Sequence, residues 1–322
     1  MFFEWVGIIV CIWIAIFFYM TLMNDCDMQL AFYEKFGKSP DSLKGKVVLI
    51  TGASSGIGEH TAYALAKSGV KLALTARRQN ELLRVKRKCI EVSDGLLTES
   101  DVLVIIVDIL DFWEHDDILQ LTLDQFGRID IVLNNAGRSQ RALFEDIDLE
   151  VDQEMFNLNV FAVVHMTRRA MEYFNERKCG HVAVVSSIAG ILGIPNSASY
   201  TASKHALHGY YNCLRTEKIG TNINVTILCP GPTFTNFLQE SFTGEPKEKY
   251  NICQKPTDKC MTAERCGYLI AVALANETAE SWMVIPPMLT MTYLWFYFPS
   301  LFLWALNSKA GRDWIFKKRD HK

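Results

Sequence analysis

Residues 46–58 read KVVLITGASSGIG, an apolar run that leads into a glycine-rich turn. The run 46–52 is short and ends in glycine, which predicts a buried parallel strand, and a helix is predicted from about Ile57 to Lys67. Glycines between a strand and a helix let backbone N–H groups approach a pyrophosphate. Glycine clusters also make ordinary turns, so the position after the first strand supports this interpretation. The predicted dinucleotide contacts in this turn are Gly52, Ser54, Ser55, Gly56, Ile57 and Gly58.

The alternation of strand and helix continues towards the C-terminus. Further strands are predicted at 71–76, 102–108, 129–135, 181–187, 222–230 and 282–285, and helices at 79–92, 112–126, 148–177 and 198–217. Strands separated by ten or more helical residues form parallel βαβ units. The expected fold class is therefore α/β: a single Rossmann-type doubly wound parallel sheet of about seven strands with helices on both faces, plus an N-terminal membrane anchor and an apolar C-terminal segment.

The end of the second predicted strand indicates which dinucleotide fits. An NAD site usually has an acidic residue there to bind the ribose 2′-hydroxyl, whereas this strand ends in Thr75-Ala76-Arg77-Arg78. A guanidinium matches a 2′-phosphate, and the alternative is a solvated arginine pair at a helix start. We therefore predict NADP(H) as the cofactor, with Arg77 as its main contact and Arg78 beside it. Asp108 is expected near the adenine. Asn135, Ala136 and Gly137 are expected near its ribose.

A candidate catalytic group lies on the helix predicted at 198–217. Tyr200 and Lys204 are four residues apart and share one helix face, a pairing that is common by chance. Ser187, however, ends a predicted strand 13 residues before Tyr200. Ligands of open α/β sheets bind beyond the carboxyl ends of the strands, so these side chains are expected to converge there.

The chemistry of this group follows from electrostatics. A phenol with a pKa of about 10 is a poor base near neutral pH. We expect the Lys204 ammonium and the positive nicotinamide to lower the pKa of Tyr200, which makes it a general acid for carbonyl reduction or a base for alcohol oxidation. Ser187 Oγ is expected to bind the substrate oxygen. A strand-end hydroxyl bonded to backbone is the alternative for Ser187, and the preferred interpretation of Ser186.

Six motifs in order resemble the short-chain dehydrogenase/reductase superfamily over residues 46 to about 285. They are TGASSGIG, NNAG (134–137), Asn159 in NLNV, Ser187 in VVSSIAG, YTASK (200–204) and Pro230-Gly231-Pro232. The resemblance implies that Asn159 completes the catalytic set of Ser187, Tyr200 and Lys204 by holding a water that relays protons to Lys204. It also implies that Tyr200, Lys204, Pro230, Gly231, Thr233 and Thr235 contact the cofactor.

Within the superfamily, the sequence looks like the membrane-bound dehydrogenase/reductase member 7 group. The features shared are the apolar N-terminus, TARR (75–78), SASYTASKHALHGYYNCLRTE (197–217) and MTYLWFYFPSLFLW (291–304). The resemblance implies a location in the endoplasmic reticulum membrane and retinoid or steroid carbonyls as substrates.

The N-terminal stretch supports a membrane location. Trp5 to Met23 carries no charge over 19 residues, and a helix of that length spans roughly 28 Å. An uncleaved anchor over 1–24 is favoured over a signal peptide, because Glu4 replaces the usual basic flank. Lys35 and Lys38, the nearest basic residues, favour a cytosolic catalytic domain, and the lumenal side stays open.

The remaining boundaries follow from composition. A linker is expected over 25–45, the NADP-binding catalytic domain over 46–285 with a lid at 233–261, and an apolar membrane-associated segment over 286–322. Pro286, Pro287 and Pro299 argue against a spanning helix in that segment. Its aromatic residues and basic tail suit the membrane interface, and a strand and helix packed on the core is the alternative for its first residues. The basic residues are Lys309, Arg312, Lys317, Lys318 and Arg319.

The composition indicates which kinds of binding partner to expect. Lys and Arg (33) nearly balance Asp and Glu (36), so no nucleic-acid partner is indicated. Nine cysteines without a C-x-x-C pair indicate neither a metal site nor a disulfide framework. The expected partners are membrane lipid and an apolar carbonyl or alcohol substrate, with a homodimer as a further candidate. Apolar residues of the lid would cover the substrate, although they could equally pack only against the protein core. These residues are Phe234, Phe237, Leu238, Phe242 and Tyr250.

The sequence allows two alternative functions. A membrane-tethered NADP(H)- or lipid-binding protein with little catalytic turnover is the main alternative, and the intact set of Ser187, Tyr200 and Lys204 argues against it. Sugar-nucleotide epimerisation on the same fold is disfavoured, because the chain lacks room for a larger C-terminal substrate domain.

Overall fold

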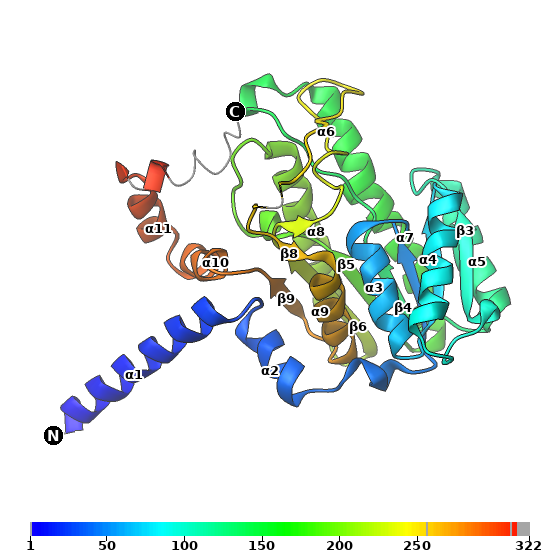
Figure 1. Ribbon diagram of the computed structural model, residues 1–322, viewed down its shortest axis with the longest axis horizontal. Coiled ribbons are helices and arrows are strands. Elements are labelled where there is room, and N and C mark those ends of the chain that lie inside the picture. Colours follow the sequence, from blue (N-terminus) through cyan, green and yellow to red (C-terminus); the bar gives the residue numbers. More distant parts are fainter. Residues whose placement is uncertain (1, 256, 310, 314–322) are drawn as a thin grey trace.

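The computed structural model describes residues 2–255, 257–309 and 311–313, and is built around a parallel sheet (Figure 1). The strand order is β3-β2-β1-β4-β5-β6-β9. The strands are β1 (Val47–Thr51), β2 (Lys71–Ala76), β3 (Val102–Ile106), β4 (Ile131–Asn134), β5 (Cys179–Val185), β6 (Asn222–Pro230) and β9 (Glu280–Met283). This sheet confirms the predicted Rossmann-type fold. The order reverses between β1 and β4, which is where ligands bind in such sheets.

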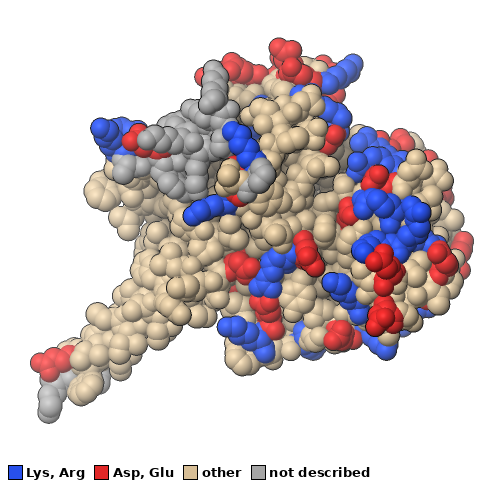
Figure 2. All heavy atoms as spheres, viewed as in Figure 1, with Lys and Arg blue, Asp and Glu red and all other residues tan. Residues whose placement is uncertain are grey.

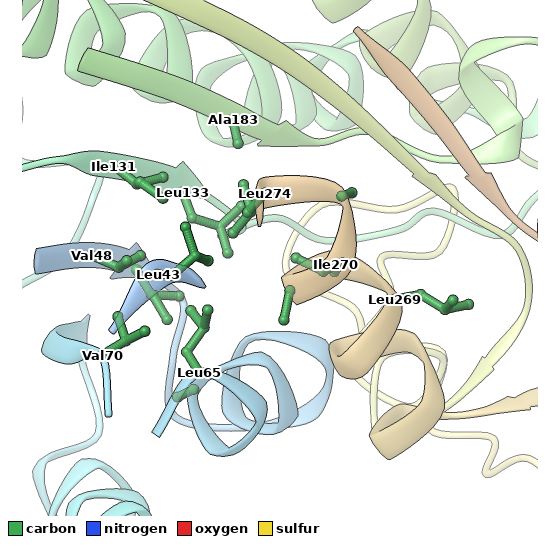
Figure 3. Packing of buried hydrophobic residues seen from close by; sticks show 14 of the residues in the cluster. Leu43, Val48, Leu65, Val70, Ile131, Leu133, Ala183, Leu269, Ile270 and Leu274 are labelled. Atoms are coloured by element: carbon green, nitrogen blue, oxygen red, sulfur yellow. The ribbon is translucent and has the colours of Figure 1, made fainter. Parts of the chain in front are cut away.

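Helices cover both faces because successive strand residues point to opposite sides. Val48 and Ile50 of β1 enter one core, and Leu49 enters the other. The first core, shown in Figure 3, is closed by α3 (Gly56–Lys67), α4 (Gln79–Val92) and α9 (Ala263–Ala275). The second is closed by α5 (His115–Phe126), α7 (Ala162–Arg177) and α8 (Ala198–Glu217). Sequence patterns did not predict α9, although it is almost wholly buried.

The helical region predicted at 148–177 is divided in two. It consists of α6 (Leu149–Phe156), one π-helical turn over Asn157–Phe161, and α7. Such turns are rare and often occur at functional sites. Within the expected lid, β7 (Thr233–Phe234) pairs with β8 (Met261–Thr262). The lid is also tied to the loop after β4, because Phe242 N donates to Ser139 O over 2.8 Å.

Residues 25–45, where a linker was expected, contain a helix that packs on the domain. It is α2 (Met28–Phe36), followed by a 3₁₀ turn over Pro40–Leu43, and Leu30 and Leu43 are buried in the first core. Asp27 caps α2 through Leu30 N at 2.9 Å and also accepts from Trp282 N of β9 at 2.6 Å. Asp27 therefore docks α2 on β9, the strand at the edge of the sheet.

The two apolar ends lie side by side. Among the described residues, α1 (Phe2–Met23) is long and apolar enough to cross a membrane, and its side chains are mostly exposed. Figure 2 shows no charged side chain along α1 beyond its N-terminal tip. It contacts α10 (Met288–Tyr297) through the rings of Phe17 and Tyr293, 5.4 Å apart. A break at Phe298 separates α10 from α11 (Pro299–Leu306). The predicted basic residues Lys317, Lys318 and Arg319 lie outside the described residues.

Candidate active site

A cavity of about 1490 Å³ opens at the carboxyl ends of the central strands. Except for Gly58 and Asn159, every site residue predicted from the sequence lines it. The cofactor candidates along it are Gly52, Ser54, Ser55, Gly56, Ile57, Arg77, Arg78, Asp108, Asn135, Ala136, Gly137, Pro230, Gly231, Thr233 and Thr235, and they share it with Ser187, Tyr200 and Lys204. Residues from seven separate regions of the chain thus meet in one space.

The glycine-rich turn between β1 and α3 is held by Asn135. Gly52 and Gly56 have φ angles of +66° and +61°, a conformation that side chains rarely adopt. Asn135 Nδ2 donates to Thr51 O at 2.9 Å and Gly52 O at 3.1 Å. A Cβ at Gly58 would lie 2.4 Å from Asn135 Nδ2, so only glycine fits. This cradle at a helix N-terminus fits a dinucleotide pyrophosphate.

The two arginines after β2 have different partners. Arg78 reaches back to the turn, donating to Ser54 Oγ at 3.0 Å and Ser55 Oγ at 2.7 Å. Arg77 is mostly exposed and pairs with Asp108 at 3.2 Å. The sequence did not predict either contact. Both guanidinium groups border the end of the cavity nearest the glycine-rich turn, where a cofactor ribose would lie in this fold.

Ser187, Tyr200 and Lys204 converge from β5 and α8. Ser187 Oγ accepts from Ala189 N at 3.1 Å and donates to Pro230 O at 3.3 Å. Ser187 also lies close enough to Tyr200 to lower the pKa of the phenol. Lys204 Nζ donates to Val185 O at 2.8 Å and lies 5.8 Å from the centre of the Tyr200 ring. Both side chains are buried.

The electrostatics of this group differ from the expectation. Burial raises the pKa of Tyr200, while Ser187 and the charge of Arg141 work to lower it. The net shift in the structure is upward, and Lys204 is not among the groups that oppose it. The reason is desolvation, since Tyr200 is only 8% exposed. Burial also lowers the pKa of Lys204 to about 8.

Asn159 lies in the π-helical turn and is fully buried. Its Nδ2 donates to Arg138 O at 2.9 Å and Ser203 Oγ at 3.0 Å, and its Oδ1 accepts from Arg138 N at 2.9 Å. A Cβ added at Gly137 would lie 3.1 Å from Asn159 Oδ1 and 3.6 Å from Lys204 Nζ. The amide and the ammonium therefore face the same small space.

Comparison with known proteins decides the family. Residues 46–246 match the short chain dehydrogenase family. The chain belongs to that family. Short-chain dehydrogenases are oxidoreductases that bind a nicotinamide cofactor, and the cradle described above fits one. Among the described residues, no group of three or more His, Cys, Asp or Glu side chains is placed to hold a metal ion.

Relatives of this short-chain dehydrogenase cover most of the chain. The human dehydrogenase/reductase SDR family member 7 is 42% identical over 297 residues, which are 91% of this chain and 86% of the relative. The Arabidopsis thaliana 11-beta-hydroxysteroid dehydrogenase-like 2 is 34% identical over 251 residues, 77% of this chain and 75% of the relative. The crystal structure of levodione reductase matches with a TM-score of 0.65 at 25% identity, over 76% of this chain and 96% of that protein. The human relative confirms the resemblance to the member 7 group.

Two groups of cavity residues had not been predicted for this short-chain dehydrogenase. Arg138 and Arg141 follow the NNAG motif and line the cavity from the loop after β4. The second group comes from α10 and α11, beyond the matched region, and consists of Met288, Met291, Trp295, Phe302 and Leu306. The apolar character of the C-terminal segment was visible in the sequence, but nothing there indicated that it reaches the cavity.

Proposed function

We propose that this chain interconverts a carbonyl and an alcohol on an apolar substrate, using NADP(H), with Tyr200 as the general acid or base. The observation that carries the proposal is that Ser187, Tyr200 and Lys204 share one cavity with apolar side chains of α10 and α11. The proposed parts are an anchor over 1–24, a catalytic domain over 46–285 with a lid at 233–261, and a membrane-associated segment over 286–322. We also propose the endoplasmic reticulum membrane as its location.

The preference for NADP(H) is supported by charge. Arg77 and Arg78 border the cavity end where the 2′-phosphate would lie, and β2 ends without a carboxylate. Asp108, an acidic side chain that borders the same part of the cavity, is paired with Arg77. A guanidinium in this position favours a phosphate over a bare ribose hydroxyl.

The proposed reaction divides its steps among the chain's own residues. When bound, the nicotinamide supplies or accepts the hydride. Ser187 Oγ donates a hydrogen bond to the substrate oxygen, and Tyr200 gives that oxygen its proton during reduction. Lys204 and Asn159 face one small space, which suits a water that returns a proton towards Tyr200.

The size and lining of the cavity support an apolar substrate. About 1490 Å³ exceeds the range of roughly 300–1,000 Å³ that ordinary ligand pockets span, so there is room for the cofactor and a large substrate. Exposed apolar side chains cover the C-terminal end of α10 and the outer face of α11, and α10 also contacts α1. A steroid or retinoid carbonyl that arrives through the bilayer fits this arrangement, and one relative carries hydroxysteroid in its name.

The test is Tyr200→Phe in the full chain. Carbonyl reduction, followed as NADPH oxidation, is expected to fall about 10³-fold, because positioned acid catalysis contributes roughly that much. NADPH binding, followed by fluorescence titration, is expected to stay within about twofold since only the hydroxyl is lost. Tyr210→Phe is the matched control, because Tyr210 lies on the same helix but is exposed. Equal turnover by wild type and Tyr200→Phe would refute the proposal.

The alternative is a membrane-tethered protein that binds NADP(H) or lipid with little turnover. It predicts tight NADPH binding by the wild type but no oxidation of NADPH with any member of a panel of steroid, retinoid and small carbonyls. Activity on polar sugars alone would instead contradict the apolar substrate while leaving the oxidoreductase chemistry in place.

A further inference from the structure

Arg141 is a guanidinium deep in the protein without a carboxylate partner. It lines the cavity together with Tyr200 and Tyr250. Its Nη1 donates to Ser139 Oγ at 2.7 Å, Gln140 O at 2.8 Å and Ser197 Oγ at 2.5 Å. All three acceptors are neutral, and no ion pair of Arg141 is found within the described part of the chain.

Two other partly buried arginines in this protein, Arg265 and Arg177, are neutralised by carboxylates. Arg265 binds Asp25 at 2.7 Å and also Glu34. Arg177 binds Asp130 at 2.8 Å. An unpaired charge in the interior costs free energy, because neutral acceptors replace only part of the lost hydration. Burial accordingly lowers the pKa of Arg141. A group that becomes negative during the reaction would offset this cost.

The contacts of Arg141 hold it beside Tyr200. Its backbone N donates to Phe242 O at 2.8 Å, and Phe242 packs in the same small buried cluster as Tyr200. Its guanidinium donates to Ser197, the N-cap residue of α8, three positions before Tyr200. The loop after β4, the lid and the start of α8 therefore fix Arg141 relative to the phenol.

We propose that Arg141 is a positioning residue whose positive charge balances the Tyr200 phenolate formed when the phenol gives up its proton. This inference rests on the proposed function and adds a second cation to Lys204. Reduction moves the Tyr200 proton to the carbonyl oxygen and leaves a phenolate, and oxidation requires the phenolate before the alcohol proton is taken. In both directions Arg141 favours the charged form.

The groups that face the two residues agree with this role. Tyr200 is faced by Ser187 and Arg141, which lower its pKa, and by the Cys229 thiol, which raises it. Lys204 Nζ lies 5.8 Å from the centre of the Tyr200 ring. Arg141 is faced by the phenols of Tyr200 and Tyr250, and both act to raise its pKa.

Arg138 offers a matched control from the same loop. It also lines the cavity and carries the same charge, but its guanidinium lies 4.5 Å from the centre of the Phe242 ring. Its charge interacts with Glu240 and Glu154 instead of with Tyr200. Removing either arginine therefore changes the net charge of the cavity equally, while only Arg141 is expected to act on the phenol.

The experiment compares full-length wild type, Arg141→Met, Arg141→Lys and Arg138→Met in lipid vesicles. We measure kcat/KM for alcohol oxidation against pH, with NADP⁺ binding measured separately. The kcat/KM for oxidation is expected to rise with pH as Tyr200 loses its proton, and we call this rise the Tyr200 limb. Arg141→Met is expected to shift the limb upward by about one pH unit, so that kcat/KM at a pH below the limb falls about tenfold. Arg141→Lys should restore most of that rate, Arg138→Met should leave the limb in place, and NADP⁺ affinity should change less than about twofold.

Two outcomes overturn the inference. A loss of rate that is uniform over pH would mean that Arg141 only braces Ser197, and an equal shift in Arg138→Met would mean a non-specific effect of net charge. If the wild type turns over no carbonyl or alcohol, the proposed function itself fails. The effect of Arg141 on the pKa of Tyr200 can then be measured without turnover. Tyrosinate absorbance is followed against pH, and the signal of Tyr200 is the difference between each protein and its Tyr200→Phe counterpart.

Discussion

The two ends of the cavity are built in different ways. At the strand end, Asn135 and Lys204 are fixed by hydrogen bonds of 2.8–3.1 Å to the backbone of β1, its turn and β5. At the outer end, the lining comes from two short apolar helices, α10 and α11, and α11 is largely exposed on its other face. Hydrogen bonds to a sheet allow little movement, whereas apolar contacts tolerate repacking. On the proposed function, we therefore expect the strand end to act on every substrate and the outer end to select among substrates.

The largest expected effect at the strand end is that of Lys204→Met. Because burial lowers the pKa of Lys204 to about 8, the ammonium is present below that pH and is lost above it. Carbonyl reduction by the wild type is expected to fall as pH rises through about 8. The variant should be roughly 10²–10³-fold slower and lack this limb, because the proton supply to Tyr200 is lost.

Rates of NADPH oxidation between pH 6 and 10 check this. The substrate should be a small water-soluble ketone, so that the outer end plays no part. If the fall in rate near pH 8 persists in Lys204→Met, another group titrates there. That result would contradict the role of Lys204 in supplying protons to Tyr200.

A smaller effect is expected at the cofactor, from Arg77→Ala. Charge-assisted hydrogen bonds contribute about 1.5–3 kcal/mol, so NADPH affinity should fall roughly 10–100-fold. NADH affinity should stay the same or rise slightly, because Asp108 is released from its pair with Arg77. Fluorescence titration of both cofactors measures the ratio.

Arg87→Ala is the control for this change, since Arg87 is an exposed arginine of α4. An equal loss of NADPH and NADH affinity in Arg77→Ala would identify Arg77 as a solvated cation with no part in cofactor choice.

The strand end could be predicted from sequence because its motifs are local. Ser187 and the glycine-rich turn each follow a strand, and the carboxyl ends of parallel strands meet at one edge of the sheet. The fold could be predicted for the same reason, because each strand and helix of a βαβ unit has a hydrophobic pattern that is visible in its own stretch of sequence. Boundaries shifted by a few residues, so that Asp108 lies two positions beyond β3.

The features that the sequence did not predict depend on contacts between residues far apart in the chain. Asp27 docks α2 on the sheet by accepting from Trp282, 255 positions later, and no local pattern reports such a bond. Arg141 matters because the lid closes over its loop through Phe242. Burial opposes the expected lowering of the Tyr200 pKa, and the degree of burial is a property of the packed structure that no local sequence pattern reports.

The smallest effect is expected at the outer end, from Trp295→Ala. Trp295 of α10 and Phe302 of α11 both line the cavity, and their rings meet edge to face at 5.6 Å. Such a pair contributes about 0.5–1.5 kcal/mol beyond its buried area. KM for a steroid or retinoid carbonyl should rise roughly threefold to tenfold. For the small ketone, kcat/KM should stay unchanged, because Tyr200 and Lys204 do not depend on these helices.

Trp304→Ala separates the cavity face of these helices from their outer face. Trp304 is 75% exposed and does not line the cavity, so its loss should leave KM for the apolar carbonyl in place when substrate concentration is expressed per lipid. A fall in kcat for the small ketone in Trp295→Ala would show that the two ends are coupled. Because α10 is hydrogen-bonded to α1 through Thr290 and Thr21 at 3.1 Å, such coupling would also connect the apolar N-terminal helix to the reaction.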